Sequence, residues 1–266
     1  MNVIVCIKYI LDPEMPPAKF KIDTEAKKVI PPEGIPLVVS PFDEQAVEAA
    51  LTIKDKQDTR ITAMTMGQDS AKDAVKHVLS MGADEGVVLS DETFEGSDAF
   101  STAYVLSKAI EKIGEYDLIL CGRQAADWDA GQVGSIIAEN LGIPVVTLAR
   151  KVEVIDSKLR VERVIPDGYE IVEVSLPAVV TVSSEIGQAR LPSGRGIIMA
   201  ARKQIPVWSA QDIDCDLSAV GIGAARSELL GLFVPSQDRK GEIISGENAA
   251  EAADNLALRL KESKII

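Results

Sequence analysis

The residues best placed to do chemistry lie between Leu120 and Ser135, where a buried strand is expected to lead through a loop into a helix. Gly122 and the small residues after it let a ligand approach the backbone closely, and the first turn of a helix offers unpaired N–H groups to an anion. Arg123 adds a guanidinium that can form charge-assisted hydrogen bonds to phosphate. Because the segment matches neither GxGxxG nor the Walker A pattern, it is consistent both with phosphate binding and with an ordinary strand-to-helix loop.

Three other segments are expected at the same edge of the sheet. Lys8 follows the first apolar run, Thr65-Met66-Gly67 closes the next one, and Ser40 to Asp43 opens a helix. Open α/β sheets bind ligands beyond the carboxyl ends of their strands, so these segments would surround a crevice of nucleotide size. Taken alone, Lys8 is better explained as an exposed lysine than as a phosphate or flavin contact, and Cys6 is better explained as a small core residue than as a reactive thiol.

The sequence offers little for side-chain catalysis. It has one histidine, His77, which excludes a His-rich metal site, and its place in a helical pattern favours a surface or packing role. The three cysteines lack CxxC spacing, which predicts buried thiols in a reducing compartment. The acidic residues near Asp91 and Asp127 are interpreted as helix caps and loop residues instead of metal ligands. We therefore predict neither a catalytic side chain nor a metal site.

Composition excludes several classes of protein. The 266 residues are 46% hydrophobic and 26% charged, which is ordinary for a folded chain and argues against disorder. The net charge of -13 argues against nucleic acid as a main partner, since phosphate binding needs a basic surface. No apolar run reaches about 18 residues, and the N-terminus lacks the pattern of a signal peptide. We predict a cytoplasmic protein without membrane insertion.

Short apolar runs alternate with amphipathic helical patterns through the first 150 residues. This alternation is typical of a parallel sheet with helices on both faces, so we predict an α/β fold with a doubly wound sheet. A small hairpin is expected over residues 20–30, and helices are expected to begin near Ser40, Ala71, Asp98 and Gln132. The predicted strands are Val3–Ile7, Arg60–Met66, Glu85–Leu89, Asp117–Cys121 and Pro144–Leu148.

After residue 150 the hydrophobic pattern alternates at every second residue, which predicts an antiparallel meander attached to the sheet. Its expected strands are 151–155, 159–165 and 169–174, followed by one more buried strand at 177–182. Residues 183–202 are expected to form a long loop, or a loop with a short helix. Residues 208–241 show no clear elements, and 247–264 predict a final helix.

Several separated motifs resemble those of the beta (small) subunit of the electron-transfer flavoproteins and follow one another in the same order. The resemblance covers most of the chain, although Pro166 stands where an acidic residue is usual and Ser40 where asparagine is common. The matching stretches are Val5–Asp12, Pro41–Ala50, Met81–Asp84, Gly122–Asp127 and Gln132–Gly134, together with Val161, Arg163, Asp167, Gly168, Glu170, Val172, Pro177, Val179, Val180 and Thr181.

The resemblance implies a flavodoxin-like subunit that pairs with a larger alpha subunit. Residues 1–205 would form the nucleotide-binding domain, with the antiparallel extension at about 150–182 and a recognition loop at about 183–203. Residues 206–266 would form an arm and helix that wrap the alpha subunit. Carried over by position, the cofactor-binding residues would be Cys6, Lys8, Ser40, Pro41, Phe42, Asp43, Thr65, Met66, Gly67, Gly122, Arg123, Gln124, Ala125, Asp127, Asp129, Gln132, Val133, Gly134 and Ser135.

In this family the beta-subunit pocket holds AMP in simple carriers and a second FAD in electron-bifurcating members. Gln132-Val133-Gly134 resembles the form common in bifurcating members, whereas simple carriers often have Gln-Thr-Gly, so FAD is favoured over AMP. The resemblance then implies that NADH reduces this FAD, that one electron passes to ferredoxin, and that the other passes through the alpha-subunit flavin to a dehydrogenase or reductase acting on acyl-CoA or hydroxy acids. The cofactor must carry this chemistry because no side chain of the chain can.

Residues 185–200 resemble the family's recognition loop, which docks on the partner dehydrogenase. Gly194 occupies the place where related loops often carry leucine, so the predicted docking residues are Leu191, Arg195, Ile197 and Met199. Exposed apolar, Met and Arg side chains favour an interface over an ordinary surface loop. A third class, nucleotide-binding proteins of universal-stress or adenine-hydrolase type, would share the sheet but would not account for the 161–181 motif or the tail.

Overall fold

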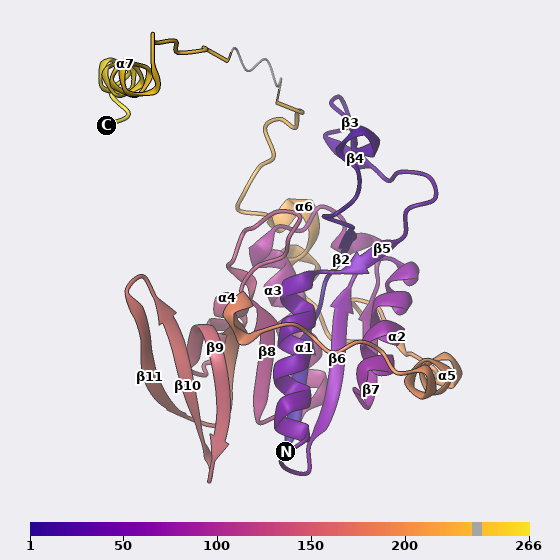
Figure 1. The fold of residues 1–266 in the computed structure, drawn as a ribbon. Helices are drawn as coiled ribbons and strands as arrows, with labels where there is room; N and C mark the ends of the chain where they lie inside the picture. The colour runs from indigo at the N-terminus through magenta and orange to yellow at the C-terminus, as the bar shows by residue number, and fades with distance from the viewer. Residues whose placement is uncertain (236–240) are drawn as a thin grey trace.

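The computed structural model describes residues 1–235 and 241–266 (Figure 1). A nine-stranded sheet forms the centre of the molecule, in the order β11-β10-β9-β12-β8-β1-β6-β7-β13. In chain order these strands are β1 (Asn2–Cys6), β6 (Arg60–Met66), β7 (Glu85–Leu89), β8 (Leu118–Gly122), β9 (Val145–Ile155), β10 (Lys158–Ile165), β11 (Gly168–Ser175), β12 (Ala178–Val182) and β13 (Val207–Trp208).

Helices cover both faces of the parallel part of this sheet, which confirms the predicted doubly wound α/β fold. One face packs against α1 (Pro41–Lys54) and α2 (Lys72–Met81), and the other against α3 (Ala99–Ile113) and α4 (Val133–Leu141). Strands such as β1 and β8 are buried on both faces, which explains why they are continuous apolar runs instead of alternating patterns.

The helix boundaries follow from local chemistry. Asp98 caps α3 by accepting hydrogen bonds from the N–H groups of Phe100 and Ser101, and Gly82 ends α2 with φ of 135°. Ser40 is the N-cap residue of α1, as the expected helix start predicts, but its side chain makes no capping hydrogen bond. The Ser40 hydroxyl instead accepts from the backbone N–H of Ala126 at 3.4 Å.

The antiparallel extension is confirmed, but its first strand differs from the prediction. The pattern predicts separate strands at residues 144–148 and 151–155, whereas β9 runs unbroken from Val145 to Ile155. It pairs parallel with β12 at one end and antiparallel with β10 at the other, with a register shift near Val180. Leu148 adopts φ of 59° at this change of partner, which interrupts the hydrophobic pattern and makes one strand look like two.

The segments after β12 include the short helix that is one of the two alternatives for residues 183–202, and more order than expected after residue 208. Residues 194–202 form the nine-residue helix α5 (Gly194–Arg202) after a 3₁₀ turn at Ser184–Ile186, and α5 packs on α2. The sequence indicates no elements over residues 208–241, yet they contain the end of β13, a 3₁₀ turn at Leu217–Ala219 and the short helix α6 (Gly221–Ala224). Their backbone hydrogen bonds to neighbouring loops supply this order, and such contacts leave no period in the sequence.

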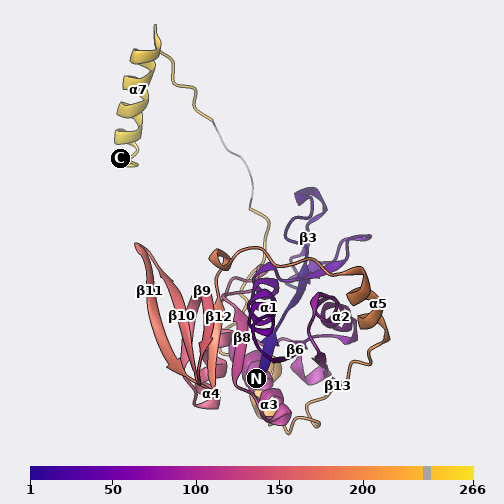
Figure 2. The same cartoon turned by 60° about the horizontal axis from the view of Figure 1, so that its bottom comes forward.

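The predicted final helix is present as α7 (Ala249–Glu262), which stands apart from the sheet in both views (Figures 1 and 2). Residues 236–240 of the predicted 206–266 arm lie outside the described residues. No helix in the described part of the chain is long and apolar enough to span a membrane.

Two small sheets lie beyond the carboxyl end of the main sheet (Figure 1). The expected hairpin is formed by β3 (Lys21–Asp23) and β4 (Lys28–Ile30) after a 3₁₀ turn at Pro17–Lys19. The other sheet pairs β2 (Tyr9–Leu11) with β5 (Leu37–Val39), a pairing that the sequence pattern does not indicate. This second pair joins the end of β1 to the start of α1 and so shapes the edge where the predicted site lies.

Candidate functional site

The predicted site residues meet at the carboxyl edge of the sheet, where β1 lies between β6 and β8. The chain reaches β6 from β1 through α1, and it later returns to the opposite side of β1 with β8. Such a reversal of strand order opens a crevice between the carboxyl ends of the strands. Thr65 and Met66 end β6, and Gly122 ends β8, so the residues expected from three separated motifs share one rim.

The Asp43 side chain connects three backbone segments of the rim by hydrogen bonds. It lies in the first turn of α1 with 6% of its surface exposed. Its carboxylate accepts the backbone N–H of Lys8 at 2.8 Å and that of Gly122 at 3.1 Å. The carbonyl of Lys8 in turn accepts the N–H of Ser40 at 2.9 Å. One buried carboxylate therefore fixes the exit of β1 and the exit of β8 against the start of α1.

Burial sets the charge state of this carboxyl group. Removal from water raises the pKa of Asp43 to about 7, against the two backbone N–H groups and the Lys8 ammonium, which lower it. Gly122 is required beside it, because a Cβ at Gly122 would lie 2.5 Å from the Asp43 carboxylate and 2.7 Å from the carbonyl carbon of Phe42. The close approach of α1 to β8 thus explains the glycine that ends the strand.

The loop between β8 and α4 folds over the start of α1 through polar contacts. The Lys8 ammonium pairs with the Asp127 carboxylate at 2.7 Å, and the Gln124 amide donates to Asp129 at 2.7 Å. The guanidinium of Arg123 lies 5.3 Å from the ring centre of Phe42. Asp127 and Asp129 are therefore engaged by neighbouring side chains.

Helix α4 presents its amino terminus to this rim. Val133 begins the helix, Gly134 and Ser135 complete its first turn, and the Gln132 side chain makes no capping hydrogen bond to a described residue. The first N–H groups of a helix have no partner inside the helix, so they offer an anion site. A Cβ at Gly134 would lie 2.7 Å from the Thr181 methyl group, which shows that the glycine lets α4 approach β12 closely.

Thr65 supplies an observation that points to a bound group. Its side chain is fully buried at the end of β6, and its hydroxyl has no hydrogen-bond partner among the described residues. A buried hydroxyl without a partner costs free energy unless a ligand or water satisfies it. The neighbouring Gly67 N–H is used by the carbonyl of Leu89. The Thr65 hydroxyl, the α4 terminus and the glycine-lined backbone fit a phosphate-containing nucleotide.

Cys121 lies at the same rim but is not among the predicted site residues. Cys6 and Cys121 are register partners on β1 and β8, and both thiols are buried. A hydrogen bond with Cys6 and burial raise the pKa of the Cys121 thiol well above its usual range, which keeps it protonated. Aligning the ends of the two predicted strands would have placed these cysteines side by side.

The predicted docking residues lie on and before α5, away from the rim. Leu191 is 88% exposed, Ile197 55% and Met199 51%, and Arg195 is exposed as well. Ile198, which is not among the predicted residues, is 58% exposed and adds to this apolar surface. The structure therefore places the predicted nucleotide rim and the predicted docking residues on two separate surfaces.

His77 is a packing residue, as expected. Its Nε2 atom lies 2.8 Å from the Glu44 carboxylate and links α2 to α1. Asp91 accepts the N–H of Thr93 and that of Ala210, which confirms its interpretation as a cap and loop residue.

Comparison with known proteins decides the family. Residues 28–213 match the model of the electron transfer flavoprotein domain. The chain belongs to the electron transfer flavoprotein beta-subunit family. It is 41% identical, over the full length of both chains, to the electron transfer flavoprotein subunit beta of Thermoanaerobacterium thermosaccharolyticum. It is 39% identical, again over both full lengths, to the caffeyl-CoA reductase-Etf complex subunit CarD of Acetobacterium woodii. The acryloyl-CoA reductase electron transfer subunit gamma of Anaerotignum propionicum is 31% identical over the full length of both chains.

Membership of the electron transfer flavoprotein family decides between the classes left open by the sheet pattern. A universal-stress or adenine-hydrolase protein would share the parallel sheet, but the family match extends through the antiparallel extension and α5. The relatives also match across the arm and α7, so the electron transfer flavoprotein pattern accounts for the whole chain.

Proposed function

We propose that this chain is the beta subunit of an electron-bifurcating electron transfer flavoprotein in the cytoplasm. It pairs with an alpha subunit and binds FAD at the carboxyl rim of its sheet. NADH is the electron donor. Electrons are divided between ferredoxin and, through the flavin of the alpha subunit, a dehydrogenase or reductase that acts on acyl-CoA or hydroxy-acid substrates.

The names of the relatives support the choice of a bifurcating reductase system. CarD is named as a subunit of a caffeyl-CoA reductase-Etf complex, and the Anaerotignum protein as an electron transfer subunit of an acryloyl-CoA reductase. Gln132-Val133-Gly134 at the start of α4 agrees with the bifurcating form of the loop. The observation that carries nucleotide binding is the buried, unpartnered hydroxyl of Thr65 at the end of β6. The open terminus of α4 lies at the same edge of the sheet.

The residues have separate roles in holding the cofactor. The first N–H groups of α4 would bind phosphate, and the Thr65 hydroxyl would donate to an acceptor of the nucleotide. Asp43 would hold the strand exits in place, while Lys8 and Asp127 would fix the loop over them. When bound, FAD supplies hydride acceptance and one-electron transfer, which the side chains cannot.

The number of flavins decides between FAD and AMP at this rim. The alpha and beta chains should be co-expressed and purified together, and their cofactors released and quantified by chromatography. We expect two FAD molecules for each heterodimer. One FAD together with one AMP would contradict the bifurcation proposal and would identify a simple carrier with a structural nucleotide.

We further propose that the surface of Leu191, Arg195, Ile197 and Met199 docks on the partner dehydrogenase. Removing both exposed aliphatic side chains in the variant Leu191→Ala/Ile197→Ala should weaken electron transfer to the dehydrogenase, because the core of an interface depends on buried apolar anchors. The flavin content should stay unchanged, since these residues lie away from the rim. Unchanged transfer kinetics would remove this surface from the proposal.

A further inference from the structure

The docking segment, defined as residues 191–199, is anchored at its start by one arginine. The Arg190 backbone N–H donates to the Glu48 carboxylate at 2.9 Å, and its guanidinium donates to the same carboxylate at 2.8, 2.9 and 3.1 Å. It also reaches Asp55, with the shorter contact at 2.7 Å. Glu48 lies on α1 and Asp55 is the C-cap residue of that helix, about two turns further on, so Arg190 ties the segment to a rigid element of the core.

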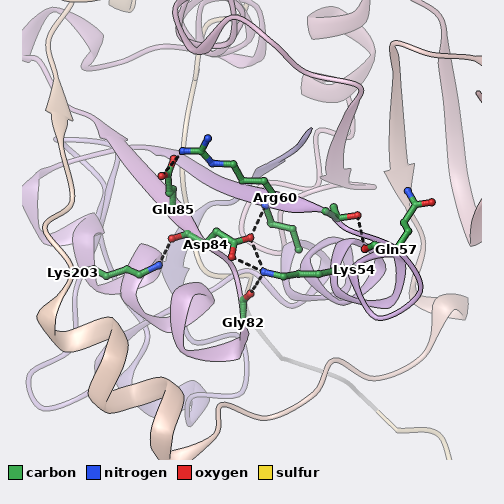
Figure 3. Close-up of polar contacts among 9 residues, drawn as sticks. Lys54, Gln57, Arg60, Gly82, Asp84, Glu85 and Lys203 are labelled. Atoms are coloured by element: carbon green, nitrogen blue, oxygen red, sulfur yellow. Dashed lines mark hydrogen bonds and ion pairs between the residues drawn. The ribbon is translucent and has the colours of Figure 1, made fainter. Parts of the chain in front are cut away.

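A second anchor follows α5. The ammonium of Lys203 donates to the backbone carbonyl of Asp84, the residue before β7 (Figure 3). The Asp84 carboxylate is itself fixed by Lys54 from α1 at 2.6 Å and by the N–H of Ile61 at 2.9 Å. Figure 3 shows these groups converging on Asp84 from separate elements. The end of the docking segment is therefore also held against the core.

Between the two anchors, α5 is seated on the end of α2. Ser193 caps α5 by accepting the N–H of Gly196 at 2.9 Å. A Cβ at Gly196 would overlap the carbonyl oxygen of Ser80, and Ala200 is buried. Leu191 lies in the segment before α5, and Ile197 and Met199 lie on α5. Their exposed apolar side chains are thus carried by a segment that packs against the core.

We propose that Arg190 is the positioning residue of the docking segment, an inference that rests on the proposed docking function of that segment. Its role is to hold residues 191–199 in the conformation that binds the partner. A segment already ordered in the free protein loses less conformational entropy on binding. When only a fraction of molecules holds the competent conformation, the apparent dissociation constant rises in inverse proportion to that fraction.

The contacts of Arg190 favour positioning over direct partner recognition. Its guanidinium is shared between two carboxylates of its own chain, and the Glu48 side chain is only 17% exposed. Releasing the guanidinium to meet a partner's charge would leave Glu48 unpaired. Arg195, by contrast, is exposed and remains available to a partner.

The test compares three variants of the purified alpha–beta complex, with caffeyl-CoA reductase as the electron acceptor. Arg190→Gln should raise the KM for the acceptor by roughly tenfold. Arg190→Lys should raise it by less, because lysine keeps the positive charge but cannot form the bidentate contact with a carboxylate. The kcat and the flavin content should not change. Arg160→Gln, an exposed arginine on β10, is the matched control and should leave the KM unchanged.

Amide hydrogen exchange gives a second measurement that needs no acceptor. Arg190→Gln should speed exchange in α5 without speeding it in β1 or β8, because only the local anchor is lost. If exchange in α5 is unchanged, or if the KM stays the same while Leu191→Ala/Ile197→Ala raises it, the role of Arg190 is overturned. If Leu191→Ala/Ile197→Ala also leaves the KM unchanged, the docking function itself fails. Should Arg190→Gln lose flavin through misfolding, Asp55→Asn removes only the more exposed ion pair and should give the same pattern with a smaller change.

Discussion

At the scale of single residues, Asp43 would serve the proposed binding site by holding the backbone around it. Its carboxylate is occupied by the N–H groups of Lys8 and Gly122, which leave two different strands. Its expected contribution to the proposed nucleotide binding is therefore the placement of both strand exits. The Thr65 hydroxyl, in contrast, has no partner among the described residues.

Asp43 should give the protein a measurable pH dependence of stability. Burial raises its pKa to about 7 in the folded chain, from an ordinary value of 3.8. The folded state therefore binds more protons than the unfolded state between these two pH values. The free energy of unfolding contributed by this group falls as the pH rises through that window and is constant above it. Urea unfolding at several pH values should show a smaller fall in Asp43→Asn than in the wild-type protein.

The same variant should also be less stable at pH 5, by about 1–3 kcal/mol, because the amide NH2 group cannot accept from the second backbone N–H, whereas the hydroxyl oxygen of the protonated carboxyl group can. Asp156→Asn, in an exposed turn, is the matched control and should keep the wild-type pH profile. A wild-type profile in Asp43→Asn would show that this carboxyl group does not titrate in that range.

Gly134 permits a test of the fit at the start of α4. In Gly134→Ala the added methyl group would meet the Thr181 methyl at 2.7 Å, so α4 must move away from the sheet. We expect a loss of about 1–3 kcal/mol in stability, together with weaker nucleotide retention. Gly223→Ala adds its methyl group to open space and should change stability by less than about 0.5 kcal/mol. Full nucleotide retention in Gly134→Ala would argue against the α4 terminus as the phosphate site.

At the scale of elements, the sequence predicts a strand or helix best where one hydrophobic period extends over the whole segment. The strands β6 and β7 match their predicted bounds because they are largely apolar and end in turn residues. The pattern divides β9 in two because its pairing partner changes at Leu148, and the sequence does not record partners. Helix α5 has glycines at its start and only one buried residue, so no core-facing stripe marks it.

The sequence predicts the site to the level of the rim but not of its contacts. Strand ends in a parallel sheet meet at one edge, so the strand pattern alone groups Lys8, Thr65 and Gly122. The backbone hydrogen bonds accepted by Asp43 and the ion pair of Lys8 with Asp127 depend on side-chain directions across separate loops. The same holds for Arg190, whose partners lie 142 and 135 positions earlier in the chain.

The packing of α5 on α2 can be tested with Gly196 and Gly194, which lie two residues apart. Gly196→Ala should destabilise the protein by about 1–3 kcal/mol, because the methyl group would overlap the Ser80 carbonyl and displace the helix. Gly194→Ala, two residues earlier, adds its methyl group to open space and should be neutral or stabilising by up to about 1 kcal/mol. Chemical unfolding of both variants measures the difference. Equal stabilities would mean that α5 does not rest on α2.

At the scale of the whole molecule, the arm carries apolar surface that the sheet domain does not cover. Leu230, Phe233 and Ile243 are largely exposed, and so is Leu258 on α7. Exposed apolar surface of this kind marks an interaction site. The net charge of -13 hides this local chemistry, just as it hides the arginines around the docking segment. We propose that the arm forms one half of an interface with the alpha subunit.

Deleting residues 241–266 should separate folding from assembly. Within the described residues α7 buries none of its side chains, so its removal should change the free energy of unfolding of the isolated chain by less than about 0.5 kcal/mol. Association with the alpha subunit should weaken at least roughly tenfold, or about 1.4 kcal/mol, because the apolar face of the helix is lost. Urea unfolding and sedimentation velocity of the mixed subunits measure the two effects. A destabilised chain with unchanged association would instead make α7 part of its own domain, because a helix that stabilises the fold must pack against it.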